Sequence, residues 1–406
     1  MSFDPENILI ASVIATFAAA VLAAMVSWSQ RKIIPSRAML AIFFAAFALS
    51  EIDSVAFVLT HEMLPIIRDG TRFVHFVANF CIMPLLLLYV RELMDFRGHS
   101  GDGAVLLRHF ALPATALIAS IAAMALPEAT REVWHTGDAT DVAMPGLGFL
   151  HYIFTILTVV LVLQWVVYVI WIARTQALHI VRLKQHFAST EGMELRWIAV
   201  LAVAMGFYIL QSMFGEALIM MGEQDPIGPR LDSMLVLIIV VALALWGLRP
   251  SPELDLAQAA LEKVTEHPDK KYEKSALGED QADRIARKLL RAMQQDLLYR
   301  DPNLTLSGLS GHIGVSLNYV SQTLNQNLGQ SFFEFINEWR VKEAVPLVEA
   351  GKTTVLAIAY EVGFNSRSSF YSAFKRVTGM TPTAYKKSKP KPRAAGNVNQ
   401  VSIDQT

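Results

Sequence analysis

The side chains best suited to chemistry in this chain lie near its C-terminus, between Val355 and Tyr385. Apolar residues recur there at three- and four-residue spacing, which predicts two helices with one buried face each. Gly363 predicts a tight turn between them, because glycine accepts the left-handed conformation that ends a helix, and Ser366 is a suitable N-cap for the second helix. The residues predicted to face inward are Val355, Ile358, Ala359, Val362, Phe370, Phe374 and Val377. Those predicted to face outward from the second helix are Arg367, Ser368, Ser369, Tyr371, Ser372, Lys375 and Arg376.

These outward side chains have the chemistry of nucleic-acid recognition. A guanidinium such as that of Arg367 can donate two hydrogen bonds to a guanine edge, and Lys375 and Arg376 can neutralise phosphates. Two short helices joined by a glycine turn, of which the second exposes basic and polar groups, are the plan of a DNA-reading helix-turn-helix. Residues 301 to 389 contain nine Lys and Arg against six Asp and Glu, a mildly basic balance that is compatible with DNA.

A second unit of the same plan comes earlier in the chain. Thr305 is the expected N-cap of a short helix, Gly314 the turn, and Ser316 the cap of a second helix that ends at Gly329. The residues predicted to face inward are Leu306, Leu309, Ile313, Val320, Leu324 and Leu328. Those predicted to face outward are Asn318, Tyr319, Ser321, Gln322 and Asn325. Asn and Gln can bond to adenine edges, but this helix has no Lys or Arg, so its base contacts would be uncharged.

Two further helices must hold these units in place. Residues 332 to 348 predict one long helix between the units, with a broad apolar stripe that can pack against both. Pro346 lies inside this helix and is expected to kink or shorten it. Residues 281 to 299 are amphipathic and predict the first helix of the soluble part, which the Asp301-Pro302 pair would end.

This part of the chain resembles the DNA-binding domain of AraC-type (arabinose-regulator) transcriptional regulators. The resemblance rests on the motifs LTLSGLSGHIGVSLNYVSQTLNQNLGQSFFEFINEWRVKEA and IAYEVGFNSRSSFYSAFKRVTGMTPTAY, and it covers about residues 300 to 387. It implies that the two units lay their second helices in successive major grooves of double-stranded promoter DNA. It also implies binding as a dimer or to repeated half-sites, so a homodimer is expected. The chain departs from the family pattern at Ser310, where the family usually has Ala.

By that likeness, residues of both units would contact DNA. Bases would be contacted by Asn318, Ser321 and Gln322 from the first unit and by Arg367, Ser368, Tyr371 and Ser372 from the second. Lys375 and Arg376 would lie on phosphates.

The first 248 residues are mostly apolar and contain seven stretches of about 20 residues, the length that crosses a bilayer. These stretches are Ile8–Trp28, Ala38–Leu59, Phe73–Met94, Phe110–Leu126, Phe149–Ala173, Leu195–Met221 and Leu231–Leu248. The sequence therefore predicts an all-α chain: a seven-helix transmembrane bundle followed by a soluble AraC-like domain with two helix-turn-helix units.

The Lys and Arg residues of the loops predict the orientation of these spans. Ten follow spans one, three and five: Arg31, Lys32, Arg37, Arg91, Arg97, Arg108, Arg174, Arg182, Lys184 and Arg196. Four lie in the other loops: Arg68, Arg72, Arg131 and Arg230. Because positively charged loops stay in the cytoplasm, we expect a multi-pass protein of the bacterial inner membrane, with its N-terminus outside and its C-terminal half on the side where DNA is.

Polar residues inside spans are costly and usually face a bundle interior or a cavity. The ones that predict a ligand cavity open to the outside are Glu51, Asp53, His75, Asn79, Gln211 and Glu216. The alternative is that such groups only hydrogen-bond the helices to one another. A metal site from Glu51, His75 and His151 has no spacing signature.

Several classes of protein are disfavoured by what the sequence lacks. Cys81 is the only cysteine, so neither an intrachain disulfide nor a cysteine zinc site can form. No Gly-rich phosphate loop, nucleophile elbow or metal-spaced histidines occur, so we expect neither an enzyme nor a cofactor.

The sequence predicts four parts. Residues 1–248 form the transmembrane sensor domain, 249–280 a cytoplasmic linker with a short helix, 281–388 the tandem helix-turn-helix domain, and 389–406 a disordered tail. The predicted function is a membrane-embedded one-component transcriptional regulator that senses an unknown small-molecule or envelope signal. The alternatives are a constitutively anchored or proteolytically released transcription factor, or a transporter-like protein with a regulatory tail.

Overall fold

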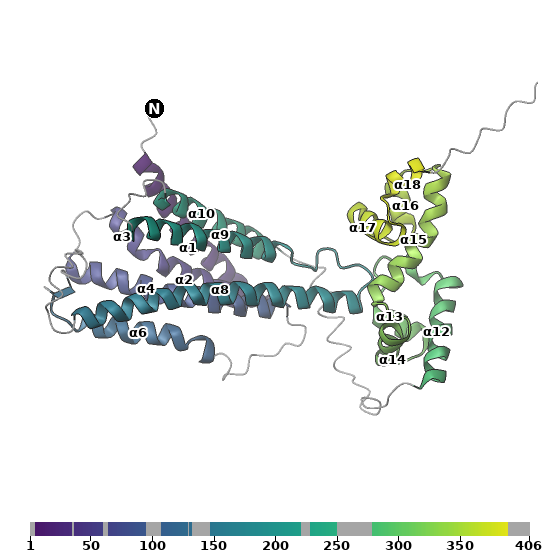
Figure 1. Cartoon of the computed structure of the whole chain (residues 1–406), viewed down its shortest axis with the longest axis horizontal. Coiled ribbons are helices and arrows are strands. Elements are labelled where there is room, and N and C mark those ends of the chain that lie inside the picture. The colour runs from purple at the N-terminus through teal and green to yellow at the C-terminus, as the bar shows by residue number, and fades with distance from the viewer. Residues whose placement is uncertain are drawn as a thin grey trace, which may run out of the picture. The chain divides into compact units, whose positions relative to one another are not determined.

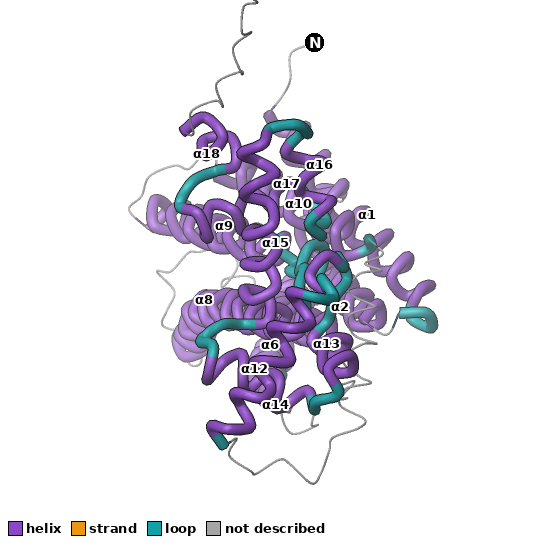
Figure 2. Tube along the Cα trace, turned by 90° about the vertical axis from the view of Figure 1, so that its right-hand side faces the viewer, coloured by secondary structure: helices purple, strands orange, loops and turns teal. Residues whose placement is uncertain are grey.

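The computed structural model describes residues 5–34, 36–59, 64–94, 107–128, 130–131, 147–220, 228–249 and 278–388. All regular elements among them are helices, as Figure 2 shows, and one isolated antiparallel bridge pairs Phe187 with Thr305. The predicted all-helical fold class is confirmed. The chain divides into two compact units, one of residues 1–179 and 195–265, the other of residues 180–194 and 266–406.

The N-terminal unit is built from the apolar helices (Figure 1). They are α1 (Pro5–Gln30), α2 (Ser36–Ser50), α3 (Ile52–Leu59), α4 (Pro65–Met94), α6 (Ala111–Met124), α8 (Leu147–His186), α9 (Trp197–Met220) and α10 (Gly228–Gly247). The last turns of α8 belong to the other unit. Helix α2 packs against α1 and α4 through Phe43, Phe44 and Phe47, which are all buried.

The predicted count of seven spans is wrong for the described residues. Four helical stretches are long and apolar enough to cross a membrane: Asn7–Gln30, Pro65–Met94, Tyr152–His186 and Arg230–Gly247. A fifth span results only if α2 and α3 count as one, and these two helices are bent by 42°. Helix α6 has 14 residues, about 21 Å at 1.5 Å per residue, which falls short of a hydrocarbon core of about 30 Å. The apolar part of α9, Trp197–Ser212, is also shorter than the four stretches that are long enough to cross a membrane.

The C-terminal unit holds the remaining helices. They are α12 (Glu279–Gln294), η2 (Leu298–Arg300), α13 (Leu306–Ile313), α14 (Leu317–Gln322), η3 (Thr323–Asn327), α15 (Phe332–Ala350), α16 (Val355–Glu361), α17 (Arg367–Thr378) and α18 (Pro382–Ser388). Helix α15 joins two cores. Phe332, Phe335 and Ile336 belong to the first, and Val341 and Val348 to the second. The predicted apolar stripe of the long helix is confirmed.

The predicted helix ends are mostly confirmed. Thr305 Oγ1 accepts a hydrogen bond from the backbone N–H of Gly308 at 3.0 Å, and Ser366 Oγ accepts one from Ser369 at 3.2 Å. Gly314 ends α13 in the left-handed conformation, with φ +61°. Ser316 takes the N-cap position of α14, but its side chain makes no capping bond, so that detail was wrong.

Three predicted orientations were wrong, and so was one helix end, because the helix predicted over residues 281 to 299 ends at Gln294. Leu328 is 37% exposed, because the chain passes from α14 into the π-turn η3, whose extra residue rotates the positions after it. Tyr319, which lies on α14 before that turn, is buried in the first core. Val377, in the last turn of α17, is 40% exposed. Pro346 does not shorten α15, which continues to Ala350.

The predicted linker and tail can be placed only in part. Residues 250–277, which include the predicted linker helix, and residues 389–406 lie outside the described residues. The three predicted boundaries between the four parts stay predictions.

Gly363 is the glycine on which the second helix-turn-helix unit most depends. Its φ is +96°, and a Cβ there would lie 2.7 Å from the carbonyl oxygens of both Tyr299 and Arg300. The next residue closes the end of α16, because Phe364 donates its backbone N–H to Ala359 at 2.9 Å. The turn therefore requires glycine for its conformation and for the close approach of the η2 backbone.

We expect Gly363→Ala to destabilise the C-terminal unit more than Gly379→Ala. Both glycines have positive φ, so each substitution strains the backbone by roughly 1–3 kcal/mol. Only Gly363 meets other atoms, and overpacking adds about 1–3 kcal/mol. Pulse proteolysis of the full-length protein across a urea series would measure the difference. Equal losses of stability in both variants would contradict the close approach.

Candidate nucleic-acid interface

Helix α17 presents the polar face that the sequence predicts for the second unit. Arg367, Ser368, Ser372, Lys375 and Arg376 are exposed, and Tyr371 is half-buried. On the opposite side, Phe364, Phe370 and Phe374 stack edge-to-face within the second core. Because this core fixes the helix, the outward face is a rigid surface.

Arg367 and Tyr371 form a pair on this face. The guanidinium carbon lies 4.9 Å from the centroid of the tyrosine ring, and Nη2 donates to the phenol oxygen at 3.2 Å. The phenol oxygen also lies 3.1 Å from Thr383 Oγ1 of α18. The hydrogen bond with Thr383 and the neighbouring Arg367 lower the pKa of the Tyr371 phenol below its usual value. The guanidinium is therefore held along the helix by weak contacts that a base edge could replace.

Arg376 lies over a ring of α15. Its guanidinium carbon is 5.5 Å from the centroid of Phe333, and Nζ of Lys184, at the end of α8, is 5.6 Å from the same ring. The pKa of the Glu334 carboxyl is lowered, mainly by the backbone N–H of Ser331 and further by Arg376 and Lys184. Lys375 and Arg376 thus differ, because Arg376 has an acidic neighbour and an aromatic contact.

Helix α14 presents an uncharged face. Asn318 is exposed, and Ser321 and Gln322 are half-buried. Gln322 Nε2 donates to Gln326 Oε1 at 2.9 Å, and Asn325 Nδ2 donates to Ser321 Oγ at 3.3 Å. These amides and hydroxyls can both donate and accept hydrogen bonds, as base edges require.

A buried arginine joins α15 to the chain around η2, and the sequence did not lead us to predict this contact. Arg340 of α15 is fully buried, and it donates from Nε to the carbonyl of Tyr299 at 2.7 Å and from Nη2 to that of Asp301 at 2.8 Å. Burial lowers its pKa to about 10, against the opposing effect of Asp301. Its position gave a signal, because Arg340 follows Ile336 by four residues and so lies on the apolar stripe.

A second feature that the sequence did not predict is the segment 187–191, which follows α8 and belongs to the C-terminal unit. The backbone N–H of Ala188 donates to Leu304 at 3.1 Å, and Ala188 is buried in the first core. Nothing in the local pattern of residues 187–191 indicates this contact.

The predicted ligand residues of the N-terminal unit form bonds between and along helices. His75 Nδ1 is hydrogen-bonded to the carbonyl of Ser50, and Asn79 Nδ2 donates to the carbonyl of His75 at 2.9 Å. Asp53 Oδ1 accepts from Thr71 Oγ1 at 2.8 Å. The structure thus brings His75 and Asn79 to the end of α2.

For the other predicted ligand residues, the structure gives the burial of two side chains. Glu51 lies half-buried at the break between α2 and α3, and Gln211 is half-buried on α9. The side chains of Glu216 and His151 lie outside the described ones. Among the described residues, no group of three His, Cys, Asp or Glu could hold a metal ion.

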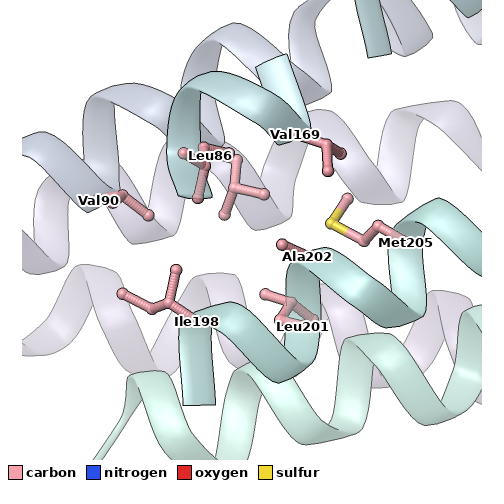
Figure 3. A pocket seen from close by; sticks show the side chains of 8 residues that line it. Leu86, Val90, Val169, Ile198, Leu201, Ala202 and Met205 are labelled. Atoms are coloured by element: carbon pink, nitrogen blue, oxygen red, sulfur yellow. The ribbon is translucent and has the colours of Figure 1, made fainter. Parts of the chain in front are cut away.

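A small pocket opens elsewhere in the N-terminal unit, between α4, α8 and α9 (Figure 3). Its lining is wholly apolar: Leu86, Val90, Val169, Ile172, Ile198, Leu201, Ala202 and Met205. None of the six predicted ligand residues lines it.

Comparisons with known proteins agree on the C-terminal part. A family model described as a helix-turn-helix domain matches residues 309–388. A "Putative AraC-like transcription regulator" of Streptomyces lividans is 35% identical over 92 residues, which are 22% of this chain and 30% of that protein. A similarly named protein of Streptomyces antibioticus is 34% identical over 92 residues, 22% of this chain and 30% of that protein.

Two further likenesses cover 23% and 31% of this chain. An uncharacterized HTH-type transcriptional regulator of Staphylococcus aureus is 33% identical over 93 residues, 23% of this chain and 12% of that protein. The solved C-terminal domain of AraT, a response regulator from Geobacillus stearothermophilus, aligns with 31% of this chain and 98% of its own, at 23% identity and a TM-score of 0.26, a score that supports no conclusion.

The chain spans less than a third of the length of the curated relatives it matches. The family model covers the region from within α13 to the end of α18. The C-terminal part of the chain is therefore an AraC-type helix-turn-helix domain.

Proposed function

We propose that this chain is a membrane-embedded transcriptional regulator that binds promoter DNA through α14 and α17. The observation that carries the proposal is the pair of polar helix faces, each placed after a glycine turn and fixed by its own core around α15. Such an arrangement presents two helices to the major groove of one DNA duplex. DNA binding is what an AraC-type domain implies.

Helices α14 and α17 make different kinds of contact with DNA in this proposal. Arg367, Ser368, Tyr371 and Ser372 of α17 contact base edges, where the guanidinium can bond to guanine in a bidentate way. Asn318, Ser321 and Gln322 of α14 read bases through uncharged groups. Lys375 and Arg376 contact phosphates, which add affinity without sequence preference.

The apolar helices support membrane embedding. Leu163, Val167 and Ile170 of α8 are 58%, 56% and 48% exposed, and an apolar outward face suits lipid rather than water. The Lys and Arg distribution of the loops, as divided by the seven predicted stretches, favours the N-terminus outside and the helix-turn-helix domain in the cytoplasm, an orientation that requires an odd number of spans. A signal would act on the N-terminal unit, where Glu51, Asp53, His75, Asn79, Gln211 and Glu216 are the proposed ligand residues. The DNA-bound form is proposed to be a homodimer.

Replacing Arg367 should weaken binding and relax its specificity. Removing a bidentate pair of hydrogen bonds to a base costs about 1–3 kcal/mol, so we expect Arg367→Ala to weaken the Kd for selected sites by roughly 5- to 150-fold. Genome-wide capture of DNA by the full-length protein, followed by titration of the enriched sites, would measure this.

The matched control for that experiment is Arg287→Ala, which removes an exposed arginine of α12 outside both proposed reading helices. Its Kd should stay close to that of the wild type. If neither protein enriched any sites, or if Arg367→Ala enriched the same sites equally well, base reading by α17 would be refuted.

Lys375 should act on all DNA sequences alike. The double-logarithmic slope of affinity against salt concentration falls by about 1 for each phosphate that the protein no longer neutralises. We therefore expect Lys375→Ala to reduce the slope by about 1 on both selected and random duplexes. Arg376→Ala should reduce it less, because Arg376 already lies near Glu334 and Phe333. A weakening of binding confined to selected duplexes would show base reading instead.

The orientation in the membrane can be tested by labelling single cysteines. In a Cys81→Ala background, Ser2→Cys should react with an impermeant maleimide in intact cells, and Ser388→Cys only after the membrane is made permeable. The opposite pattern would place the helix-turn-helix domain outside the cytoplasm and exclude DNA as its partner.

A further inference from the structure

The segment that follows α8 packs as part of the C-terminal unit, although residues 195–265 of the other unit separate the two parts of that unit along the chain. Phe187 pairs with Thr305 in an antiparallel bridge, and Ala188 donates its backbone N–H to Leu304. Both Phe187 and Ala188 are buried. The start of the segment therefore completes the first helix-turn-helix unit directly before its N-cap, Thr305.

The carbonyl of Ala188 faces the central helix. Arg340 Nη1 and Asn337 Nδ2 each lie 3.4 Å from this oxygen, and both side chains are buried. The same guanidinium holds the carbonyls of Tyr299 and Asp301. The segment thus supplies an acceptor to a buried charge, and buried charges need such acceptors.

The far end of the segment contacts the second helix-turn-helix unit. Asn365 Nδ2 donates to Ser189 Oγ at 3.3 Å, and Ser366 Oγ donates to a carboxylate oxygen of Glu191. Ser366 is the N-cap of α17. A segment of five residues thus contacts the first unit, the central helix and the cap of the reading helix.

We propose that this segment, Phe187–Glu191, is an intramolecular inhibitor of DNA binding through which the N-terminal unit controls the helix-turn-helix domain. The proposal rests on the proposed function, because it assigns a control to the same two reading helices. When docked, the segment places the Glu191 carboxylate at the N-terminus of α17. It also connects the first unit, through Ala188, to the N-cap of α17, through Glu191.

The inhibition follows from charge. The first turn of a reading helix approaches DNA most closely, and the positive end of the helix dipole attracts the negative phosphate there. In the docked segment that place holds another anion, Glu191, on the hydroxyl of Ser366. The carboxylate and a phosphate therefore compete, and each repels the other.

The control follows from continuity of the chain. Helix α8 runs without a break from Leu147 in the N-terminal unit to His186, directly before the segment. Lys184, in its last turn, lies over Phe333 of α15. A signal that shifts α8 in the membrane therefore pulls the segment away from Ser366 and frees the reading helix. Such a signal must bind the released state more tightly than the docked one.

The first test changes only the charge. Glu191→Gln keeps an oxygen that can accept a hydrogen bond from Ser366 but removes the negative charge. One charge at about 6 Å from a phosphate changes the affinity for DNA by roughly 3- to 10-fold. We expect full-length Glu191→Gln in nanodiscs to bind duplex DNA tighter by that factor. The control is Glu194→Gln, which removes a charge from a carboxylate that bonds to Thr190 within the loop, and it should change Kd by less than about twofold.

The second test fixes the docked state. In a Cys81→Ala background, Ser189→Cys with Asn365→Cys places two thiols where two side chains now bond, so a short bifunctional thiol reagent should join them. We expect the joined protein to bind DNA at least about fivefold more weakly than the same protein before treatment. Duplex DNA added first should slow the joining.

Three results would overturn the proposal: no joining of the two thiols, equal DNA affinity before and after joining, or no gain of affinity in Glu191→Gln. Formation of the cross-link also reports that the unit is folded, so a weak binder cannot be dismissed as misfolded. If the two thiols join but no form of the protein binds DNA even at low salt, the proposed function fails, and the inhibition assigned to the segment falls with it.

Discussion

The C-terminal unit depends on one buried guanidinium. Arg340 is fully buried in the middle of α15, and a charge in such a place is tolerated only when its donors find acceptors. Its acceptors include the backbone carbonyls of Tyr299 and Asp301 around η2, and that of Ala188 from a distant segment of the chain, so that with α15 itself three stretches are joined. Because backbone carbonyls cannot move without their segments, this side chain fixes where three stretches of main chain meet. The two helix-turn-helix cores lie on either side of that point along α15.

The two reading faces are unequal, and this has a physical meaning for the proposed function. Helix α17 carries three cationic side chains and α14 carries none. Phosphate contacts supply most of the affinity of DNA-binding proteins and all of its salt dependence. Uncharged amides such as Gln322 add discrimination at little gain in affinity. Under the proposed function, the second unit would supply more of the affinity than the first, whose uncharged contacts would add discrimination.

The sequence predicted what depends on neighbours in the chain. The caps at Thr305 and Ser366, the turns at Gly314 and Gly363 and the stripe of α15 all follow from spacing and local backbone preference. It failed where one extra residue changes the register of a helix, since the π-turn η3 turned Leu328 outward. It also counted a continuous apolar run as one span where α2 ends and α3 begins, because composition does not reveal a bend.

The contacts of the segment 187–191 could not be predicted for a different reason. Asn337 and Ala188 are 149 residues apart in the chain, and Ser366 and Glu191 are 175 apart. No periodicity extends over such a separation, and an exposed polar loop with the same composition would look identical. Arg340 alone gave a hint, since a charged residue on a buried stripe demands acceptors that its own helix cannot provide.

The insertion of the segment into a distant domain also has a consequence for the order of folding. Long-range contacts form late, because the chain between them must be closed into a loop first. During synthesis, residues 187–191 leave the ribosome long before Leu304 and Arg340 are made. The helix-turn-helix domain is therefore complete only after its C-terminal residues pack against this earlier segment, which is already attached to the end of α8. A chain begun at residue 278 would lack that partner, leaving the guanidinium of Arg340 one acceptor short. The helix-turn-helix domain is thus not an exchangeable C-terminal module, because the segment that completes it is joined directly to α8 of the N-terminal unit.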